Sequence, residues 1–253
     1  MKRVLLLGML FLVGWHNTLY AATRGDVKVL EAADSICYNV SKLAKDYLLY
    51  AHYPQKSKLR FVLKERLSAL DADMHDIAIS TKDTKTKGVL KYFAYEKMRI
   101  EAMIDQKPSN ENAMEVLDFS ESFSEGARSI AKHHFYVPSP EEELWIVTRS
   151  MTQYLEEIIK YYVAQNTIKD DPQLAIKMRA AKMEFLKNLK IVNAYSYTEE
   201  LKATRTYINR LWTTLETYLS KGDKLPLPLL ATRMGEQMEA SIDLLGVYHS
   251  KNQ

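Results

Sequence analysis

Apolar residues recur every three or four positions along most of the chain, which is the spacing that places them on one face of an α-helix. The first such run consists of Ile36, Val40, Leu43, Ala44, Tyr47 and Leu48. The sequence has no valine- and threonine-rich runs of alternating polarity, which are typical of β-strands. The pattern therefore predicts an all-α fold.

The apolar pattern repeats at an offset of about 115 residues. At this offset the first run corresponds to Met151, Leu155, Ile158, Ile159, Tyr162 and Val163. Three later runs have counterparts at the same offset; they are Leu63, Leu70, Met74 and Ile77, then Tyr92, Phe93, Ile100, Met103 and Ile104, then Met114, Phe119, Phe123, Ala127 and Ile130. Self-similarity at one fixed offset favours a duplicated helical unit whose apolar faces form the core.

Polar and proline-containing segments separate the apolar runs. The segment FYVPSPEEE (135–143) divides the two halves of the chain, and its two prolines disfavour a continuous helix there. Within it, Ser139 and Glu142 have the spacing of a capping box, and Asp171 before Pro172 predicts another helix start. We therefore expect two tandem antiparallel four-helix bundles, over 23–137 and 138–253, with helices of about 20 to 25 residues.

Residues 1–22 have the layout of a secretory signal peptide. Lys2 and Arg3 precede an apolar run over 4–13, and the small residues Ala21 and Ala22 close the segment. The apolar run is about half of the roughly 20 residues that a membrane-spanning helix needs. This pattern predicts an exported protein, periplasmic or secreted, that is cut after Ala21 or Ala22. An uncleaved N-terminal anchor is the alternative.

Composition and motifs narrow the class of function. The 35 Lys and Arg residues nearly balance the 32 Asp and Glu residues, so the chain lacks the basic excess typical of a nucleic-acid partner. A single cysteine, Cys37, excludes an internal disulfide. The Glu-x-x-His pairs of di-iron bundles, the nucleophile elbow and the phosphate loop are all absent from the sequence. We therefore expect no catalytic residue, no metal site and no cofactor.

Three segments resemble one family. ADSICYNVSKLAKDYL (33–48), VLDFSESFSEGARSIAKHH (116–134) and RLWTTLETYL (210–219) are similar to the N-terminal sensory module of type IV pilus methyl-accepting chemotaxis transducers, the PilJ-type domain. The first segment matches the family's opening helix at Ala33, Ala44, Lys45, Tyr47 and Leu48. The resemblance covers most of residues 27–250. It implies a four-helix sensory unit in tandem, without the membrane and signalling segments of those receptors.

The resemblance also implies a candidate anion-binding site on the first helix of each half. In related nitrate-sensing bundles an arginine of the first helix binds the anion, but that position is Ser35 in the first half and Ser150 in the second. Arg149 is one residue away, and a helix turns by about 100° per residue, so we expect its side chain to point elsewhere unless the register slips. This departure predicts no tight binding of nitrate or nitrite.

The sequence thus predicts a non-catalytic, exported sensory or binding module that contacts a membrane receptor or another envelope protein. A small-molecule ligand would be held by polar residues of the first helix in each half, and an oligomer is compatible with this function. The ligand-contacting residues that we expect are Ser35, Asn39, Ser41, Arg149, Ser150 and Gln153. The alternative is a structural subunit, without a ligand, of an envelope assembly such as a pilus, motor or secretion machine.

Overall fold

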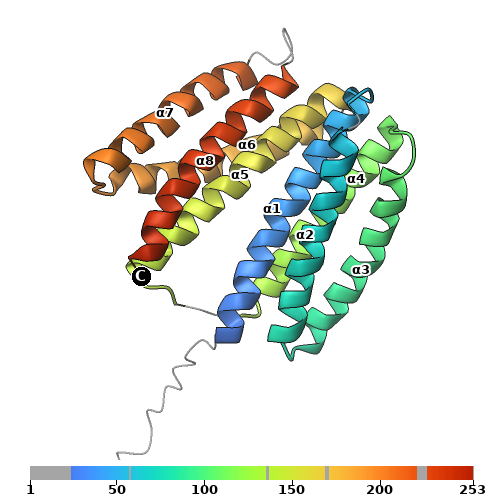
Figure 1. Ribbon diagram of the computed structural model, residues 1–253, viewed down its shortest axis with the longest axis horizontal. Helices are drawn as coiled ribbons and strands as arrows, with labels where there is room; N and C mark the ends of the chain where they lie inside the picture. The colour runs from blue at the N-terminus through green and yellow to red at the C-terminus, as the bar shows by residue number, and fades with distance from the viewer. Residues whose placement is uncertain (1–23, 57, 135–136, 169–170, 221–226, 253) are drawn as a thin grey trace, which may run out of the picture.

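The structure is a computed structural model that describes residues 24–56, 58–134, 137–168, 171–220 and 227–252 (Figure 1). Within these ranges the chain is all-α, as predicted, with eight helices and no strand. The helices are α1 (Arg24–His52), α2 (Lys58–Ser80), α3 (Thr84–Ile104), α4 (Asn110–Ala131), α5 (Pro140–Thr167), α6 (Pro172–Ala194), α7 (Glu199–Ser220) and α8 (Pro228–Lys251). The expected signal peptide over 1–22 lies outside the described residues.

Helices α5 to α8 repeat the lengths of α1 to α4 in the same order. The helices α1 and α5 have 29 and 28 residues, and α2 and α6 have 23 each. The third and fourth pairs have 21 and 22 residues and then 22 and 24 residues. The first pair is longer than the predicted 20 to 25 residues because no proline interrupts either segment.

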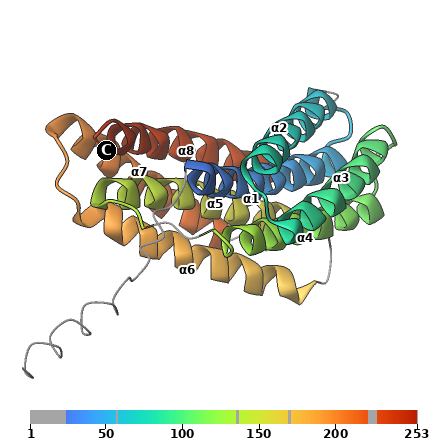
Figure 2. The same ribbon diagram turned by 90° about the horizontal axis from the view of Figure 1, so that it is seen from below.

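The helices α1 and α5 lie side by side at the centre of the molecule (Figures 1 and 2). On one side α1 packs against α2 and α4, and on the other side α5 packs against α6 and α8. Arg149 contacts Glu31 near the start of α1, whereas Glu156 contacts Lys45 further along it. The two central helices therefore run in the same direction.

Matching contacts join the last helix of each half to the first. His134 Nδ1, just beyond α4, lies 2.7 Å from Asp26 Oδ1 in the first turn of α1. About 115 residues later, His249 Nδ1 in the last turn of α8 lies 3.1 Å from Glu141 Oε2 in the first turn of α5. Both pairs place a carboxylate at a helix N-terminus, where the helix dipole favours negative charge.

Side chains cap the helix ends where the sequence indicated. The Ser139 hydroxyl accepts from the Glu142 amide, and the Glu142 carboxylate accepts from the Ser139 amide, which completes the predicted capping box. The Asp171 carboxylate likewise caps α6, with Pro172 in its first turn. The cap at Ser139 thus sets the start of α5, the first helix of the second half, and the cap at Asp171 sets the start of α6.

One continuous hydrophobic core runs through both halves and includes all six residues of the first predicted run. Because α1 is covered on every side, each residue from Asn39 to Tyr50 is buried, polar ones included. Two predicted core positions are wrong: Tyr92 is 47% exposed and Met114 is 46% exposed. In the first case the neighbouring Phe93 fills the core instead, stacked on Phe123 with ring centroids 4.0 Å apart. In the second case α4 turns Ala113 inward.

Candidate functional site

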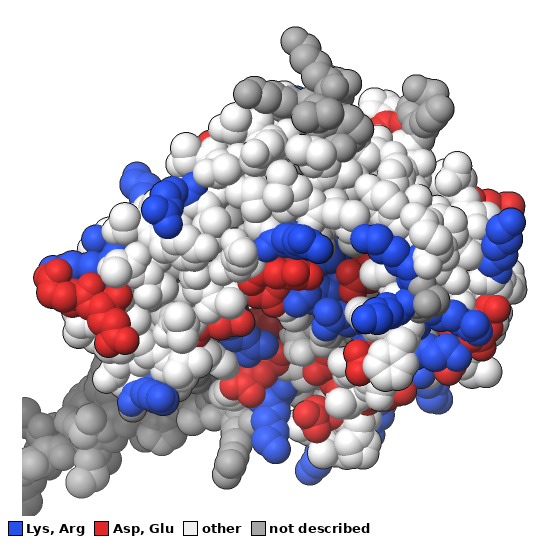
Figure 3. All heavy atoms as spheres, turned by 45° about the horizontal axis from the view of Figure 1, so that its top comes forward, with Lys and Arg blue, Asp and Glu red and all other residues white. Residues whose placement is uncertain are grey.

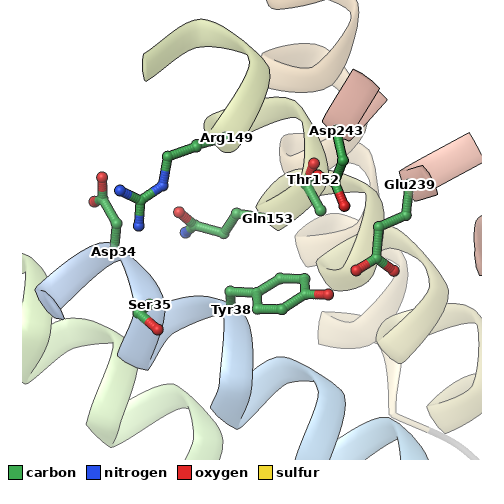
Figure 4. Close-up of a pocket in the computed structure, with 8 residues that line it drawn as sticks. All are labelled: Asp34, Ser35, Tyr38, Arg149, Thr152, Gln153, Glu239 and Asp243. Atoms are coloured by element: carbon green, nitrogen blue, oxygen red, sulfur yellow. The ribbon is translucent and has the colours of Figure 1, made fainter. Parts of the chain in front are cut away.

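A cavity of about 170 Å³ lies between α1, α5 and α8 (Figure 4). Its lining residues are Asp34, Ser35, Tyr38, Arg149, Thr152, Gln153, Glu239 and Asp243. We call it the interhelix cavity. The volume is below the range of about 300 to 1,000 Å³ that drug-sized ligands occupy, so it suits a small molecule. Figure 3 shows one face of the molecule that is hollowed near its centre, with acidic and basic side chains gathered around the hollow.

Helical spacing explains why these side chains meet. On α8, Glu239 and Asp243 are four residues apart, and on α5, Arg149 and Gln153 are four residues apart. Residues at this spacing share one face of a helix. Each helix therefore directs a pair of polar groups into the same space, and Figure 4 shows the Gln153 amide between the side chains from α1 and α8.

Arg149 lies at one end of the cavity, where protein groups already hold it. Its Nη2 donates to the backbone carbonyl oxygen of Glu31 at 3.0 Å, and its guanidinium carbon lies 4.8 Å from the centre of the Trp145 ring. Burial raises the pKa of the nearby Asp34 carboxyl, and the positive charge of Arg149 opposes that rise. Arg149 therefore offsets part of the negative charge of Asp34, although no salt bridge joins these two residues.

The opposite end of the cavity holds a second oppositely charged pair. Lys42 Nζ lies 2.7 Å from Glu239 Oε1, and the same ammonium group donates to the Tyr38 hydroxyl. Burial raises the pKa of Glu239 to about 7 and lowers the pKa of Lys42 to about 8. The direct contact opposes both shifts, because an opposite charge stabilises the ionised form of each group.

The cavity carries an excess of negative charge. Three carboxylates line it, and two cations face them: the Arg149 guanidinium and the Lys42 ammonium, which pairs with Glu239. Burial raises the pKa of Asp243, and the positive charge of Lys42 opposes that rise. Asp243 stands exposed at the edge of the cavity, with no ion pair to it among the described residues. An ammonium group is the ligand chemistry that such a site favours. Across the described ranges there is no group of three or more His, Cys, Asp and Glu residues arranged to hold a metal ion.

Further along the two central helices, buried charged groups link α1 to α5 and α5 to α4. Lys45 Nζ lies 2.7 Å from Glu156 Oε2, with side-chain exposures of 1% and 0%. The buried Lys160 ammonium donates to the Ser120 hydroxyl at 3.3 Å. The second carboxylate oxygen of Glu156 and the Ser41 hydroxyl have no hydrogen-bond partner. This layer is closed to solvent and fixes how α1 and α5 face each other.

Three of the expected ligand-contacting residues, Ser35, Arg149 and Gln153, line the cavity. Asn39 donates instead to Asp73 Oδ2 of α2 at 2.9 Å. Ser41 is fully buried beside the ionic layer, and Ser150 is not among the lining residues.

Arg149 was expected to point away from an anion site inside one four-helix unit, and its side chain lines a cavity between the two halves instead. Sequence reasoning missed Asp34, Tyr38, Glu239 and Asp243. For Glu239 and Asp243, the signal was their spacing of four residues on α8, next to the apolar face.

No protein-family model, curated protein or solved structure matches the chain. None of the described helices is long and apolar enough to cross a lipid bilayer.

Proposed function

We propose that the protein is a non-catalytic binding module that holds a small organic ammonium ion in the interhelix cavity. The observation that carries the proposal is the unbalanced charge of that cavity, where the carboxylates of Asp34, Glu239 and Asp243 face only two cations, Arg149 and Lys42. The hydroxyl groups of Tyr38 and Thr152 and the amide of Gln153 would orient the ligand by hydrogen bonds.

The proposed architecture is a tandem duplication of a four-helix unit. Three observations support it: the matching helix lengths, the packing of α1 and α5 in the same direction, and the two His–carboxylate pairs. Both pairs join residues 108 apart in sequence, so the relation between the last and first helix is the same in both halves. The binding cavity would then be a product of the duplication, since it needs residues of both copies.

The module would act in the cell envelope, as the N-terminal sequence and the resemblance to PilJ-type sensory domains indicate, and would contact a membrane receptor or another envelope protein. A candidate contact surface is α3, where Tyr92, Tyr95 and Met98 are 47%, 63% and 68% exposed. Their spacing of three residues places them along one side of the helix. The same surface also favours the second candidate function, a structural subunit of an envelope assembly that binds no ligand.

Binding of an amine tests the proposal and separates the two functions. Butylamine and related small amines should raise the melting temperature of residues 23–253, because a ligand that binds the native state stabilises it. Calorimetric titration should then give a saturable isotherm with one amine per chain. If no amine in the panel changes the melting temperature or gives heat on titration, the binding function is wrong and the structural function is favoured.

Variants locate the site. Asp243→Asn should weaken amine binding about 10-fold or more, since a hydrogen bond to a charged group contributes about 1.5 to 3 kcal/mol. Asp118→Asn is the matched control, because Asp118 is an exposed carboxylate on α4 that does not line the cavity. Equal loss of affinity in the two variants would indicate nonspecific attraction to negative charge and would contradict the assigned site.

A further inference from the structure

A second cavity shares a wall with the interhelix cavity. It measures about 330 Å³ and is lined by Lys28, Glu31, Ala32, Ser35, Asp73, Asp76, Trp145 and Arg149. Ser35 and Arg149 line both cavities. Helices α1, α2 and α5 thus form a compartment that adjoins the one between α1, α5 and α8.

The negative charge extends through both compartments. Their lining residues include six carboxylates but only two cationic groups; the carboxylates are Glu31, Asp34, Asp73, Asp76, Glu239 and Asp243, and the cations are Lys28 and Arg149. The second compartment has its own acidic end on α2, where Asp73 and Asp76 are three residues apart on one face. A ligand with a single positive charge would leave one acidic end uncompensated.

The acidic end on α2 is organised by hydrogen bonds. Asp73 Oδ2 accepts from Ser35 Oγ and from Asn39 Nδ2, each at 2.9 Å. Burial raises the pKa of this carboxyl despite those two bonds, so an added positive charge beside it would be stabilising. Asp76 is exposed, and no salt bridge within 4 Å joins it to a described residue.

Each compartment also has an aromatic wall. Tyr38 lines the first and Trp145 lines the second. Lys42 Nζ lies 4.5 Å from the centre of the Tyr38 ring, and the Arg149 guanidinium carbon lies 4.8 Å from that of Trp145. These rings therefore already bind cations, and their remaining surface can cover methylene groups. Helix α2 packs on α1, and Glu239 of α8 pairs with Lys42 of α1, so a separation on the order of 10 Å, the diameter of one helix, lies between the acidic ends. Separated cationic ends with an apolar middle are the chemistry of an extended aliphatic amine.

We propose that the ligand is a linear aliphatic polyamine that spans both cavities. One ammonium group lies between Glu239 and Asp243, and another lies beside Asp73 and Asp76. The methylene chain passes Ser35 and the guanidinium of Arg149, which Glu31 and Trp145 hold against the wall. This inference rests on the proposed function, because it assigns the class of amine to the same site.

Titration of residues 23–253 with three probes tests the length and charge of the ligand. Butylamine has one ammonium group, putrescine has two at a short separation, and spermidine has three along a longer chain. At about 0.15 M salt, where exposed charges are screened beyond about 8 Å, spermidine should bind at least 10-fold more tightly than butylamine. Equal affinities for the three probes would overturn the polyamine assignment and leave the amine-binding function standing. If none of the three probes binds, both the polyamine assignment and the amine-binding function are wrong.

Two variants separate the compartments. Asp76→Asn should weaken spermidine binding about 3- to 10-fold without a change in butylamine affinity, because only the longer ligand reaches α2. Asp243→Asn should weaken both ligands, and the control Asp118→Asn should weaken neither. Unchanged spermidine affinity in Asp76→Asn would contradict a ligand that spans the two cavities, even if spermidine binds the protein.

Discussion

Lys45 Nζ lies 2.7 Å from Glu156 Oε2, and this contact joins α1 to α5 where both side chains are removed from solvent. Burial alone disfavours the Lys45 ammonium, but the nearby carboxylates, chiefly those of Glu156 and Asp46, together outweigh that cost and raise the pKa of Lys45. The two side chains are therefore stable in their charged forms only while they contact each other. Either charge alone at this place would be buried without compensation.

Lys45→Met should destabilise the protein by about 3 to 5 kcal/mol, since it leaves the Glu156 carboxylate buried without its partner. Urea unfolding followed by circular dichroism measures the change. The double variant Lys45→Met with Glu156→Leu should recover most of the loss, because apolar side chains of similar volume can replace a buried ion pair. A double variant less stable than either single variant would show that the charges themselves stabilise the contact. Lys202→Met, in an exposed pair with Glu199, is the control and should cost less than about 1 kcal/mol.

Gly126→Ala should destabilise the protein by about 1 to 3 kcal/mol through overpacking. A Cβ atom at this position of α4 would meet two atoms of the Phe93 ring at 2.7 Å, and that ring is already stacked on Phe123. Gly88→Ala on α3 is the matched control, since a Cβ there meets nothing within 4 Å. In an open helical position, alanine should stabilise by about 0.5 to 1 kcal/mol. Equal effects of the two substitutions in thermal unfolding would contradict the packing of α3 on α4.

The helices could be predicted from the sequence because each apolar run buries one face of its helix. The six residues of the first run, which begins at Ile36 and ends at Leu48, lie in the core as expected. The start of α5 was readable because Ser139 and Glu142 act within a single turn. Lys45 and Glu156 were not readable as interior residues, since charged residues on a helix are ordinarily solvent-exposed. Their burial depends on the contact of α1 with α5, which no local pattern encodes.

The candidate site was predictable only in part for the same reason. Ser35, Arg149 and Gln153 were expected as polar residues of the first helix in each half, and they lie in the lining. Asp34 and Asp243 come from helices far apart in sequence, and their meeting follows from the packing of one half on the other. Arg149 lines the cavity between the halves because the packing of α5 against α1, and not the helical rotation alone, decides what its side chain meets.

The Glu239 carboxyl should make stability pH-dependent below neutrality. Its pKa is raised by burial from 4.5 to about 7, so the folded state binds more protons than the unfolded state in that range. Its contribution is fully present below about pH 4.5 and is lost as pH rises through 7. From pH 5 to pH 7, the wild type should therefore lose about 1 to 3 kcal/mol relative to Glu239→Gln, in which this group no longer titrates. Urea unfolding at both pH values gives the difference. Parallel pH profiles would show that the contact with Lys42 cancels the effect of burial.

Nitrate should bind more weakly than about 1 mM, which corresponds to roughly −4 kcal/mol. Arg149 is the only guanidinium in the interhelix cavity, and it already donates to the Glu31 carbonyl oxygen and faces the Asp34 carboxylate. An entering anion would have to displace these partners inside a cavity with excess negative charge, and desolvating an anion is costly unless a cation pairs with it. Calorimetric titration of the wild type with nitrate should give no saturable heat. Asp34→Asn, which frees Arg149 of its neighbouring carboxylate, should bind nitrate more tightly than the wild type does. Micromolar binding by the wild type that disappears in Arg149→Ala would show that the cavity is an anion site and would contradict the assignment of an ammonium ligand.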